Sequence, residues 1–156
     1  MTGDKEVIRA LNKVLGQSLI AINQYFLHAR MAQHWGLDAL NNTLYAQSIS
    51  EMKWSDALIA RILLLGGLPN LQELGKIYIG EDVPEIIECN LRLEKQKFDI
   101  ITAAMTLCES QQDYVSRQLL TTLKDGNEEY EDWLETQEDL IKALGIENYI
   151  QAQMNE

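Results

Sequence analysis

Two glutamates stand at positions where helical periodicity predicts burial. Glu51 lies in a stripe of apolar residues that recur every three or four positions, and Glu94 has the same place in a later stripe. A buried carboxylate needs a cation or hydrogen-bond donors, because an unpaired charge is costly to remove from water. Glutamate and histidine three residues apart share one helix face and can hold a metal ion together. Here the residue three positions after Glu51 is Trp54.

Met52 follows Glu51 directly, so its side chain points about a quarter-turn away from the core. The flank that it faces also carries Tyr45, Ile49 and Ile59. A thioether can ligate a soft metal centre, but a methionine on an apolar flank more often packs or contacts another subunit. Residue types alone therefore favour packing at this position over ligation.

The elements that must position these side chains are long helices. Apolar periodicity predicts a helix over residues 4–34 with Asp4 as its N-cap, and a second from Asp38, taken as its cap, to the Gly66-Gly67 pair. Asp82 and Glu85 have capping-box spacing and open a third helix that continues to residue 108. A fourth is expected from the Asp113 cap to residue 144, and a short one over residues 146–153.

The connections between the helices decide the fold class. The first and third connections are short, whereas residues 66–81 form a glycine-rich crossover that is too long for a tight turn. This pattern predicts an all-α fold: a ferritin-like four-helix bundle with one long crossover and a short fifth C-terminal helix, in a single domain over residues 1–156. Long helices with exposed flanks also favour a symmetric oligomer.

The composition and net charge of the chain limit the classes of partner that it can bind. The chain has 156 residues, of which 46% are hydrophobic, and 13 basic against 24 acidic residues give a net charge of -11. This charge disfavours nucleic-acid and anionic-membrane binding and favours cations. We find neither an apolar run long enough for a membrane span nor a signal peptide, and therefore expect a cytoplasmic protein. Cys89 and Cys108 are expected to be free thiols.

Beyond this pattern, the sequence resembles the bacterioferritins, the haem-containing ferritins, over essentially its whole length. The resemblance is carried by NQYFLHAR at 23–30, GGLPNL at 66–71, IGEDV at 79–83, DYVSR at 113–117, DWLET at 132–136 and NYIQAQ at 148–153. It implies an iron-storage shell of 24 subunits that holds iron as a mineral. It also implies a ferroxidase activity that oxidises Fe(II) at a di-iron centre with six ligands.

The resemblance, carried over residue by residue, leaves only two of those six ligands. Glu51 and Glu94 are kept, and the other four positions hold Ser18, Trp54, Asn127 and Tyr130. We therefore do not expect an intact di-iron centre. Our hypothesis is a hydrogen-bonded polar plug of the two carboxylates with Trp54, Tyr130 and Asn127. In it the Trp54 and Tyr130 rings fill the volume of the missing ligands, and the indole N–H and the phenol O–H can donate to the carboxylates. The alternative is an unorthodox metal site that adds Glu128 or Glu131.

The resemblance changes the interpretation of Met52. Bacterioferritins bind one haem b per subunit pair across a two-fold interface, with one methionine from each subunit as axial ligand, and Met52 matches that position. The residues that match the haem pocket are Leu19, Asn23, Phe26, Tyr45 and Ile49. The resemblance further implies a docking surface for bacterioferritin-associated ferredoxin at Leu68, Asn70, Glu81 and Glu85.

These expectations combine into a functional hypothesis. The chain is expected to bind haem at a two-fold interface of the shell and to pass electrons inward for iron release, beside a second subunit type that keeps the ferroxidase ligands. Two alternatives stay open at this point. One is a self-sufficient ferroxidase, and the other is a helical oligomeric scaffold without iron chemistry. Whether the chain alone is an enzyme is left undecided.

Overall fold

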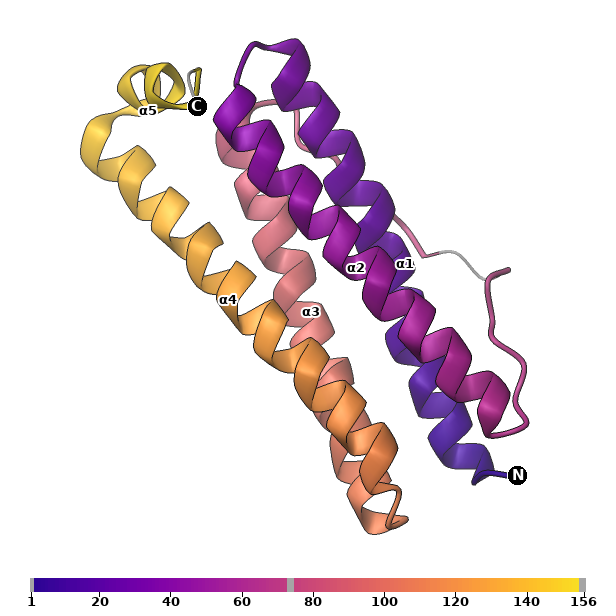
Figure 1. Cartoon of the computed structure of the whole chain (residues 1–156). Coiled ribbons are helices and arrows are strands. Elements are labelled where there is room, and N and C mark those ends of the chain that lie inside the picture. The colour runs from indigo at the N-terminus through magenta and orange to yellow at the C-terminus, as the bar shows by residue number, and fades with distance from the viewer. Residues whose placement is uncertain (1, 73–74, 155–156) are drawn as a thin grey trace.

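The computed structural model describes residues 2–72 and 75–154; residues 73–74 of the expected crossover and the chain ends lie outside them. The described residues form α1 (Lys5–His34), α2 (Asp38–Leu64), α3 (Val83–Ser110), α4 (Tyr114–Leu144) and α5 (Ile146–Gln153). The four long helices lie side by side, and α5 lies at the end of the bundle where α1 turns into α2 (Figure 1). The predicted all-α bundle with a short fifth helix is confirmed.

Most helix starts are those that the capping residues predict. The Asp4 carboxylate accepts from the backbone N–H of Glu6 at 2.8 Å, and Asp82 accepts from that of Glu85 at 2.9 Å. Asp113 caps α4 in the same way through the N–H of Ser116 at 3.0 Å. A side-chain oxygen at this position satisfies an N–H that has no partner within the helix, which is why these residues mark helix starts.

The predicted cap of α2 is wrong by one residue. The N-cap is Leu37, and Asp38 is the first helical residue. Gly36 takes a left-handed conformation (φ 80°), which turns the chain so sharply that Leu37 already donates its N–H to the carbonyl of Ala32 at 2.9 Å. The buried Leu37 side chain fixes this entry point, and Asp38 remains in the first turn, where the helix dipole favours a negative charge.

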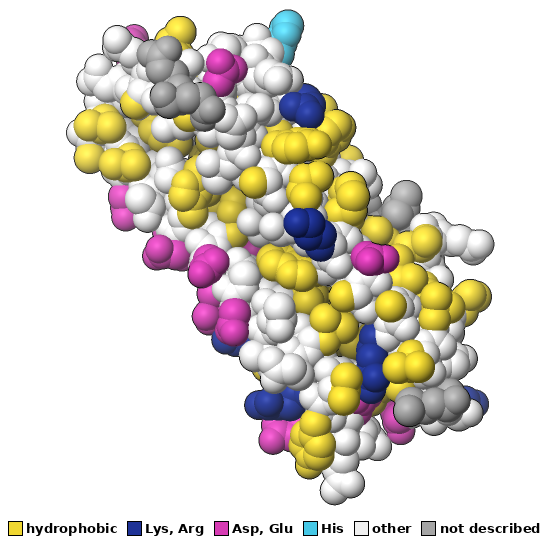
Figure 2. Space-filling view, viewed as in Figure 1, with side chains coloured by type: hydrophobic (Ala, Val, Ile, Leu, Met, Phe, Trp, Pro, Cys, Tyr) yellow, Lys and Arg dark blue, Asp and Glu magenta, His cyan; other side chains and the backbone are white. Residues whose placement is uncertain are grey.

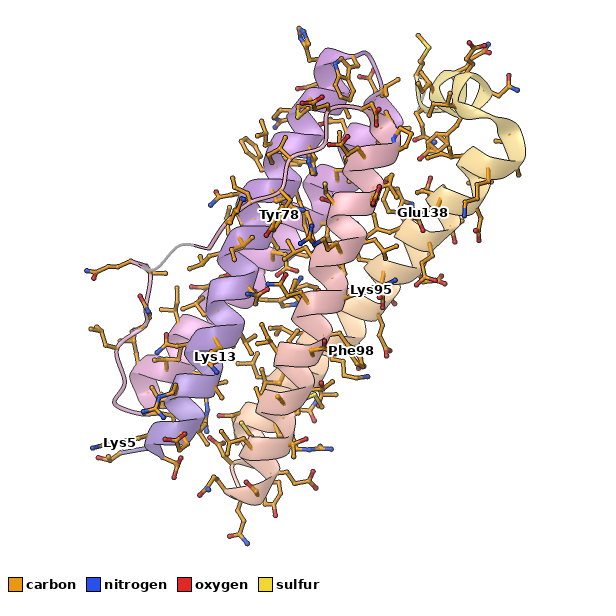
Figure 3. All side chains as sticks on the ribbon, turned by 180° about the vertical axis from the view of Figure 1, so that it is seen from behind. Lys5, Lys13, Tyr78, Lys95, Phe98 and Glu138 are labelled. Carbon is orange, nitrogen blue, oxygen red and sulfur yellow. The ribbon has the colours of Figure 1, made fainter. Side chains whose placement is uncertain are left out.

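The crossover runs along the outside of α1, which holds it by side-chain hydrogen bonds (Figure 3). At one end Asn12 donates to the carbonyl of Leu68 at 3.1 Å. At the other end Gln24 accepts from the N–H of Tyr78 at 3.1 Å, and His28 from that of Gly80 at 3.0 Å. These side-chain hydrogen bonds satisfy backbone N–H and C=O groups of the crossover that would otherwise be paired within a helix.

The apolar core is divided into two clusters. One cluster lies at the α5 end of the bundle and includes Tyr25, Leu44 and Leu134, and the other lies at the opposite end and includes Leu11, Leu58 and Leu120. The helical positions between them carry a layer of buried polar side chains: Ser18, Ser48, Glu51, Ser55, Glu94, Lys97 and Asn127. Glu51 and Glu94, the two glutamates that the sequence analysis identified, both lie in this polar layer.

Candidate functional site

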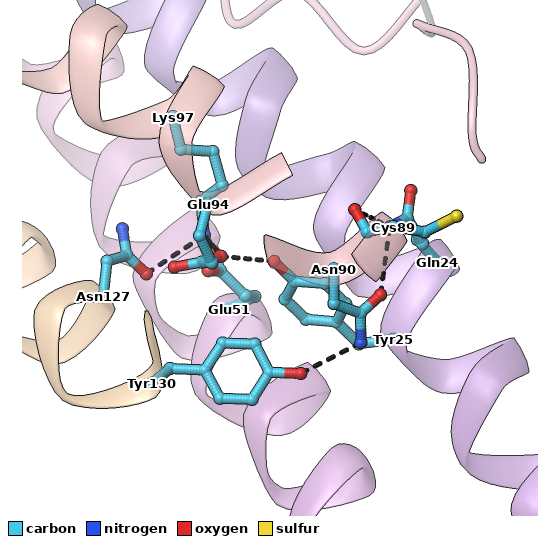
Figure 4. Close-up of polar contacts among 9 residues, drawn as sticks. All are labelled: Gln24, Tyr25, Glu51, Cys89, Asn90, Glu94, Lys97, Asn127 and Tyr130. Carbon is cyan, nitrogen blue, oxygen red and sulfur yellow. Dashed lines mark hydrogen bonds and ion pairs between the residues drawn. The ribbon is translucent and has the colours of Figure 1, made fainter. Parts of the chain in front are cut away.

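The polar layer is organised around a buried lysine. Lys97, on α3, is 1% exposed, and its ammonium group donates to Glu51 of α2, to Oε2 of Glu94 at 2.9 Å and to Oδ1 of Asn127 of α4 at 3.0 Å (Figure 4). The two glutamates thus share one cation. Burial of a lysine is tolerated only with such partners.

The first helix reaches the same cluster through Tyr25. Its hydroxyl donates to Oε2 of Glu94, the oxygen that also accepts from Lys97. The Lys97 Nζ lies 5.8 Å from the centroid of the Tyr25 ring, within the range of a cation–π contact. The polar layer therefore joins all four long helices through one ammonium group.

Burial and mutual charge set the protonation of these groups. Burial raises the pKa of Glu51 to about 7; the attraction of Lys97 opposes this rise and the repulsion of Glu94 adds to it. Burial alone lowers the pKa of Lys97, but the two carboxylates outweigh it and leave the pKa raised. Burial, with the negative charge of Glu94, raises the pKa of Tyr25 and Tyr130 well above 10. The layer therefore holds an ammonium cation and two neutral phenols.

Trp54 fills space beside the layer rather than donating into it. A Cβ built on Gly126 of α4 would lie 2.5 Å from Cη2 of the Trp54 ring and closer still to Cζ2. The indole therefore lies against the helix backbone at Gly126, where no larger residue fits. Among the described residues the indole N–H makes no hydrogen bond to Glu51 or Glu94, so this part of the plug hypothesis is wrong.

Tyr130 also differs from the hypothesis. Its hydroxyl accepts from Nδ2 of Asn90 at 3.0 Å, and its ring packs on Tyr25 with centroids 5.1 Å apart. Within the described chain, the donors to the carboxylates are Lys97 and Tyr25. Sequence reasoning missed Lys97, although its position three residues after Glu94 puts both on one helix face.

A second buried network continues from Tyr130 to the crossover. Oδ1 of Asn90 accepts from Gln24 at 3.0 Å and contacts Nδ1 of His28 at 2.8 Å. Because Nε2 of His28 accepts from the N–H of Gly80, the ring hydrogen is on Nδ1 and the imidazole is neutral. Burial lowers the pKa of His28 to about 4. His28 is therefore a structural residue that ties the crossover to the bundle.

Ser18, the remaining substituted position, is fully buried on α1 beside the glutamates. Five polar atoms of the layer have no hydrogen-bond partner within the described chain: Oγ of Ser18, Oγ of Ser55, Oε2 of Glu51, Oε1 of Glu94 and Nδ2 of Asn127. The side chains of Glu51, Glu94 and Asn127 are each bound to Lys97 through their other polar atom. The layer is therefore held by the ammonium group and not by a closed ring of hydrogen bonds.

The residues predicted to contact haem form two stripes on the outer face of α1 and α2. Leu19, Asn23 and Phe26 follow helical spacing on α1, and Tyr45, Ile49 and Met52 follow it on the antiparallel α2. The stripes lie side by side, because the Phe26 and Tyr45 rings are 6.2 Å apart. Met52 is 51% exposed, and Phe26 and Tyr45 are exposed as well. Hydrophobic side chains gather over this side of the molecule, whereas acidic ones follow α4 (Figure 2).

The predicted docking residues form two pairs at opposite ends of the crossover. Leu68, which is 82% exposed, and Asn70 are held at Asn12 near the start of α1. Glu81 and Glu85 are exposed at the other end of the crossover, where Gly80 is bound to His28. The separation of sixteen positions between Asn12 and His28 corresponds to about 24 Å along α1, a distance that a protein–protein interface of ordinary size spans.

Comparison with known proteins settles the family. A family model described as Ferritin-like domain matches residues 8–144. The chain is 42% identical to the bacterioferritin of Mycolicibacterium paratuberculosis over 96% of its own length and 94% of that protein. It is 41% identical to a bacterial ferritin of Pseudomonas aeruginosa and 39% identical to one of Synechocystis sp., over 99% of this chain and the whole of each relative. The chain belongs to the bacterioferritin family.

This membership places the chain in a family of iron-storage proteins that form oligomeric shells. No helix within the described residues is both long and apolar enough to cross a membrane. The thioether of Met52, with aromatic and aliphatic side chains along both stripes, fits a haem in its chemistry, because a thioether is one of the side chains that ligate haem iron and the haem ring is largely apolar.

A two-iron centre does not fit the residues of the polar layer. The Lys97 ammonium lies between the carboxylates of Glu51 and Glu94, where its positive charge repels a metal ion. The alternative that adds Glu128 or Glu131 does not fit either, because Glu128 is exposed and paired with Lys124 at 3.0 Å, and within the described residues neither carboxylate completes a metal-binding group with Glu51 and Glu94. The described residues contain no group of three or more His, Cys, Asp or Glu side chains placed to hold a metal.

Proposed function

We propose that this chain is the haem-carrying, ferroxidase-silent subunit of a cytoplasmic iron-storage shell of 24 subunits, and that it co-assembles with a second subunit that keeps the di-iron ligands. The observation that carries the proposal is the ammonium of Lys97 between Glu51 and Glu94. Iron is the cargo of the shell, and this chain contributes wall, haem contacts and electron entry rather than oxidation.

The silent centre follows from charge and ligand number. Each ferrous ion prefers five or six oxygen or nitrogen ligands, with carboxylates to balance its charge. Glu51 and Glu94 supply two carboxylates, and Lys97 already neutralises part of that negative charge. Fe(II) entering the layer would meet a fixed cation, so oxidation by this chain alone is expected to be no faster than in buffer.

The haem function is assigned to the outer face of α1 and α2. Met52 would supply one axial thioether from each of two subunits, while Phe26 and Tyr45 would cover the apolar parts of the haem. When bound, haem supplies one-electron transfer, and thioether ligands give it a higher potential than imidazole does. The ferredoxin that would deliver electrons would dock on Leu68, Asn70, Glu81 and Glu85, along the outer side of the crossover.

The haem assignment is tested by replacing Met52 with leucine. The shell of the Met52→Leu variant should assemble but lack haem absorption, because leucine keeps the apolar volume and removes the ligand. Met154→Leu is the matched control, since Met154 is a methionine of similar exposure (48%) at the C-cap of α5. Haem absorption of normal intensity in purified Met52→Leu shells would refute the assignment.

The silent centre and the second subunit are tested on the same preparations. Stopped-flow iron oxidation by shells of this chain alone should match the protein-free blank, whereas fast oxygen consumption would instead identify a self-sufficient ferroxidase. Native mass spectrometry of shells isolated from the source cells should show two subunit masses together with haem. Shells with one mass, no haem and no mineral would identify an iron-inactive scaffold.

A further inference from the structure

We propose that Lys97 is a built-in cation that takes the place of bound metal in the polar layer, so that the bundle closes without metal and the carboxylates bind a divalent cation only when Lys97 is removed. The inference concerns the folded chain itself and holds whether or not the proposed second subunit exists.

The first argument is the set of groups around the ammonium. Lys97 is bound by an oxygen of Glu51, an oxygen of Glu94 and the amide oxygen of Asn127, and these come from three different helices. Oxygen ligands from carboxylates and an amide are the set that hard divalent cations such as Mn²⁺ prefer. The surroundings of the ammonium therefore have the chemistry of a cation site whose occupant is covalently part of the chain.

The second argument is the pair of unused carboxylate oxygens. Oε2 of Glu51 and Oε1 of Glu94 are buried and have no hydrogen-bond partner within the described chain. Without Lys97 the layer would hold two carboxylates and no cation, an arrangement that is unfavourable at this depth. The same oxygens would then be free to take a metal ion.

The third argument is that two different residues supply the positive charge and the volume that a bound metal centre would otherwise provide. Lys97 supplies positive charge from α3, and Trp54 supplies volume from α2 by lying against Gly126. Metal sites usually couple folding to ion binding. With both parts supplied by side chains, the fold of this chain should not depend on metal.

The test uses intact shells and two substitutions of one residue. Lys97→Met removes the charge and keeps most of the volume, whereas Lys97→Ala removes both and leaves room for an ion. Each should lower Tm by about 10 °C, the loss expected when one partner of a buried ion pair is removed from a chain of this size. Lys95→Ala, which removes an exposed lysine from the same helix, should leave Tm unchanged.

Mn²⁺ then distinguishes the variants. Added Mn²⁺ should restore the Tm of Lys97→Ala, with about one more bound ion per chain counted from the loss of the free Mn²⁺ paramagnetic resonance signal. It should not restore Lys97→Met, which lacks space, or the Lys97→Ala/Glu94→Gln double variant, which lacks a ligand. The wild-type protein and its Glu94→Gln variant should bind equal numbers of Mn²⁺ ions, and the Tm of the wild type should not respond to a chelator.

Three results would overturn the proposal. The first is Mn²⁺ binding by the wild-type protein that disappears in Glu94→Gln, because the layer would then hold metal beside Lys97. The second is a Lys97→Met variant as stable as the wild type. The third is a folded Lys97→Ala variant that gains no ion. If Lys97→Ala folds only when Mn²⁺ is present, the proposal is supported; if it does not fold under either condition, the first two results decide.

Discussion

Replacing Gly126 with alanine should destabilise this chain, although the same change inside a helix is normally favourable. Gly126 lies within α4, and the Trp54 ring occupies the place that a Cβ on this residue would take. Alanine is favoured over glycine by about 1 kcal/mol in a helix interior, so helix propensity alone predicts a gain. The contact with Trp54 predicts a loss, and the sizes of the two effects decide the sign.

The loss should be the larger effect. A Cβ at Gly126 would lie 2.5 Å from Cη2 of Trp54, whereas carbon atoms in contact are about 3.5 Å apart, so the ring must move by about 1 Å. An indole is rigid, and overpacking of this kind costs about 1–3 kcal/mol. We therefore expect Gly126→Ala to lower the free energy of unfolding by about 1 kcal/mol after the gain in propensity is subtracted.

Trp54→Ala reverses the expected sign. Without the indole, the three atoms nearest to the new Cβ are gone, and Gly126→Ala should then stabilise the chain by about 1 kcal/mol. Guanidinium unfolding followed by circular dichroism, at one protein concentration, measures the four members of this double-mutant cycle. The coupling between the two residues should be about 2 kcal/mol.

Gly16 provides the matched control for this cycle. It lies within α1, and a Cβ built there meets no described side chain or other backbone within 4 Å, so Gly16→Ala should stabilise the protein in either background. If Gly126→Ala stabilises the wild-type protein as much as Gly16→Ala does, or has the same effect with and without Trp54, then the indole does not hold this position and the steric argument fails.

Two further predictions concern buried hydrogen bonds. Since folding lowers the pKa of His28 from about 6.5 to about 4, the unfolded chain binds that proton more tightly, and the contribution of His28 to stability should be fully present above pH 6.5 and fall by up to about 3 kcal/mol as the pH drops to 4. The raised pKa of Glu51, about 7, acts with the opposite sign over the same range in both proteins, so the difference between the wild type and His28→Gln measures the His28 part, and equal slopes for both proteins would contradict it. Asp113→Ala should cost about 2 kcal/mol, because it removes both the cap at Ser116 and the 2.8 Å ion pair with Arg61, whereas Asp113→Asn, which keeps a capping oxygen, should cost less than half of that in the same guanidinium assay.

The fold was predictable because its signals are local. The spacing of apolar residues gives the helices, and Asp4, Asp82 and Asp113 each mark a helix start within three residues of the group that they cap. The error at Asp38 has a non-local cause, since the buried side chain of Leu37 decides where α2 begins. Periodicity shows which face is apolar but not which neighbour it meets.

The polar layer was only partly predictable for the same reason. Glu51 and Glu94 were identified because a carboxylate in an apolar stripe is conspicuous, and Lys97 was missed because lysine normally marks a solvent-exposed face. Gly126 was visible in the sequence only as a weak helix former. Its actual role depends on Trp54 of another helix. Such pairings require knowledge of the packed bundle.

Three of the four substituted positions, Trp54, Asn127 and Tyr130, are matched by partners that suit them. Asn127 accepts from Lys97, the hydroxyl of Tyr130 accepts from Asn90, and the indole of Trp54 lies where Gly126 leaves room. Agreement of this kind between charge, hydrogen bonding and volume is what specifies a single packed state.

Under the proposed function, it follows that the four substitutions at the iron-ligand positions are not independent of one another. Restoring glutamate and histidine at those positions would still leave the ammonium of Lys97 between the two remaining carboxylates, because that charge comes from α3, outside the six ligand positions. A histidine in place of Trp54 would also leave the space beside Gly126 less well filled, at a cost in packing. The residue that must change first for this centre to accept iron is therefore Lys97, which a comparison restricted to the six ligand positions does not examine.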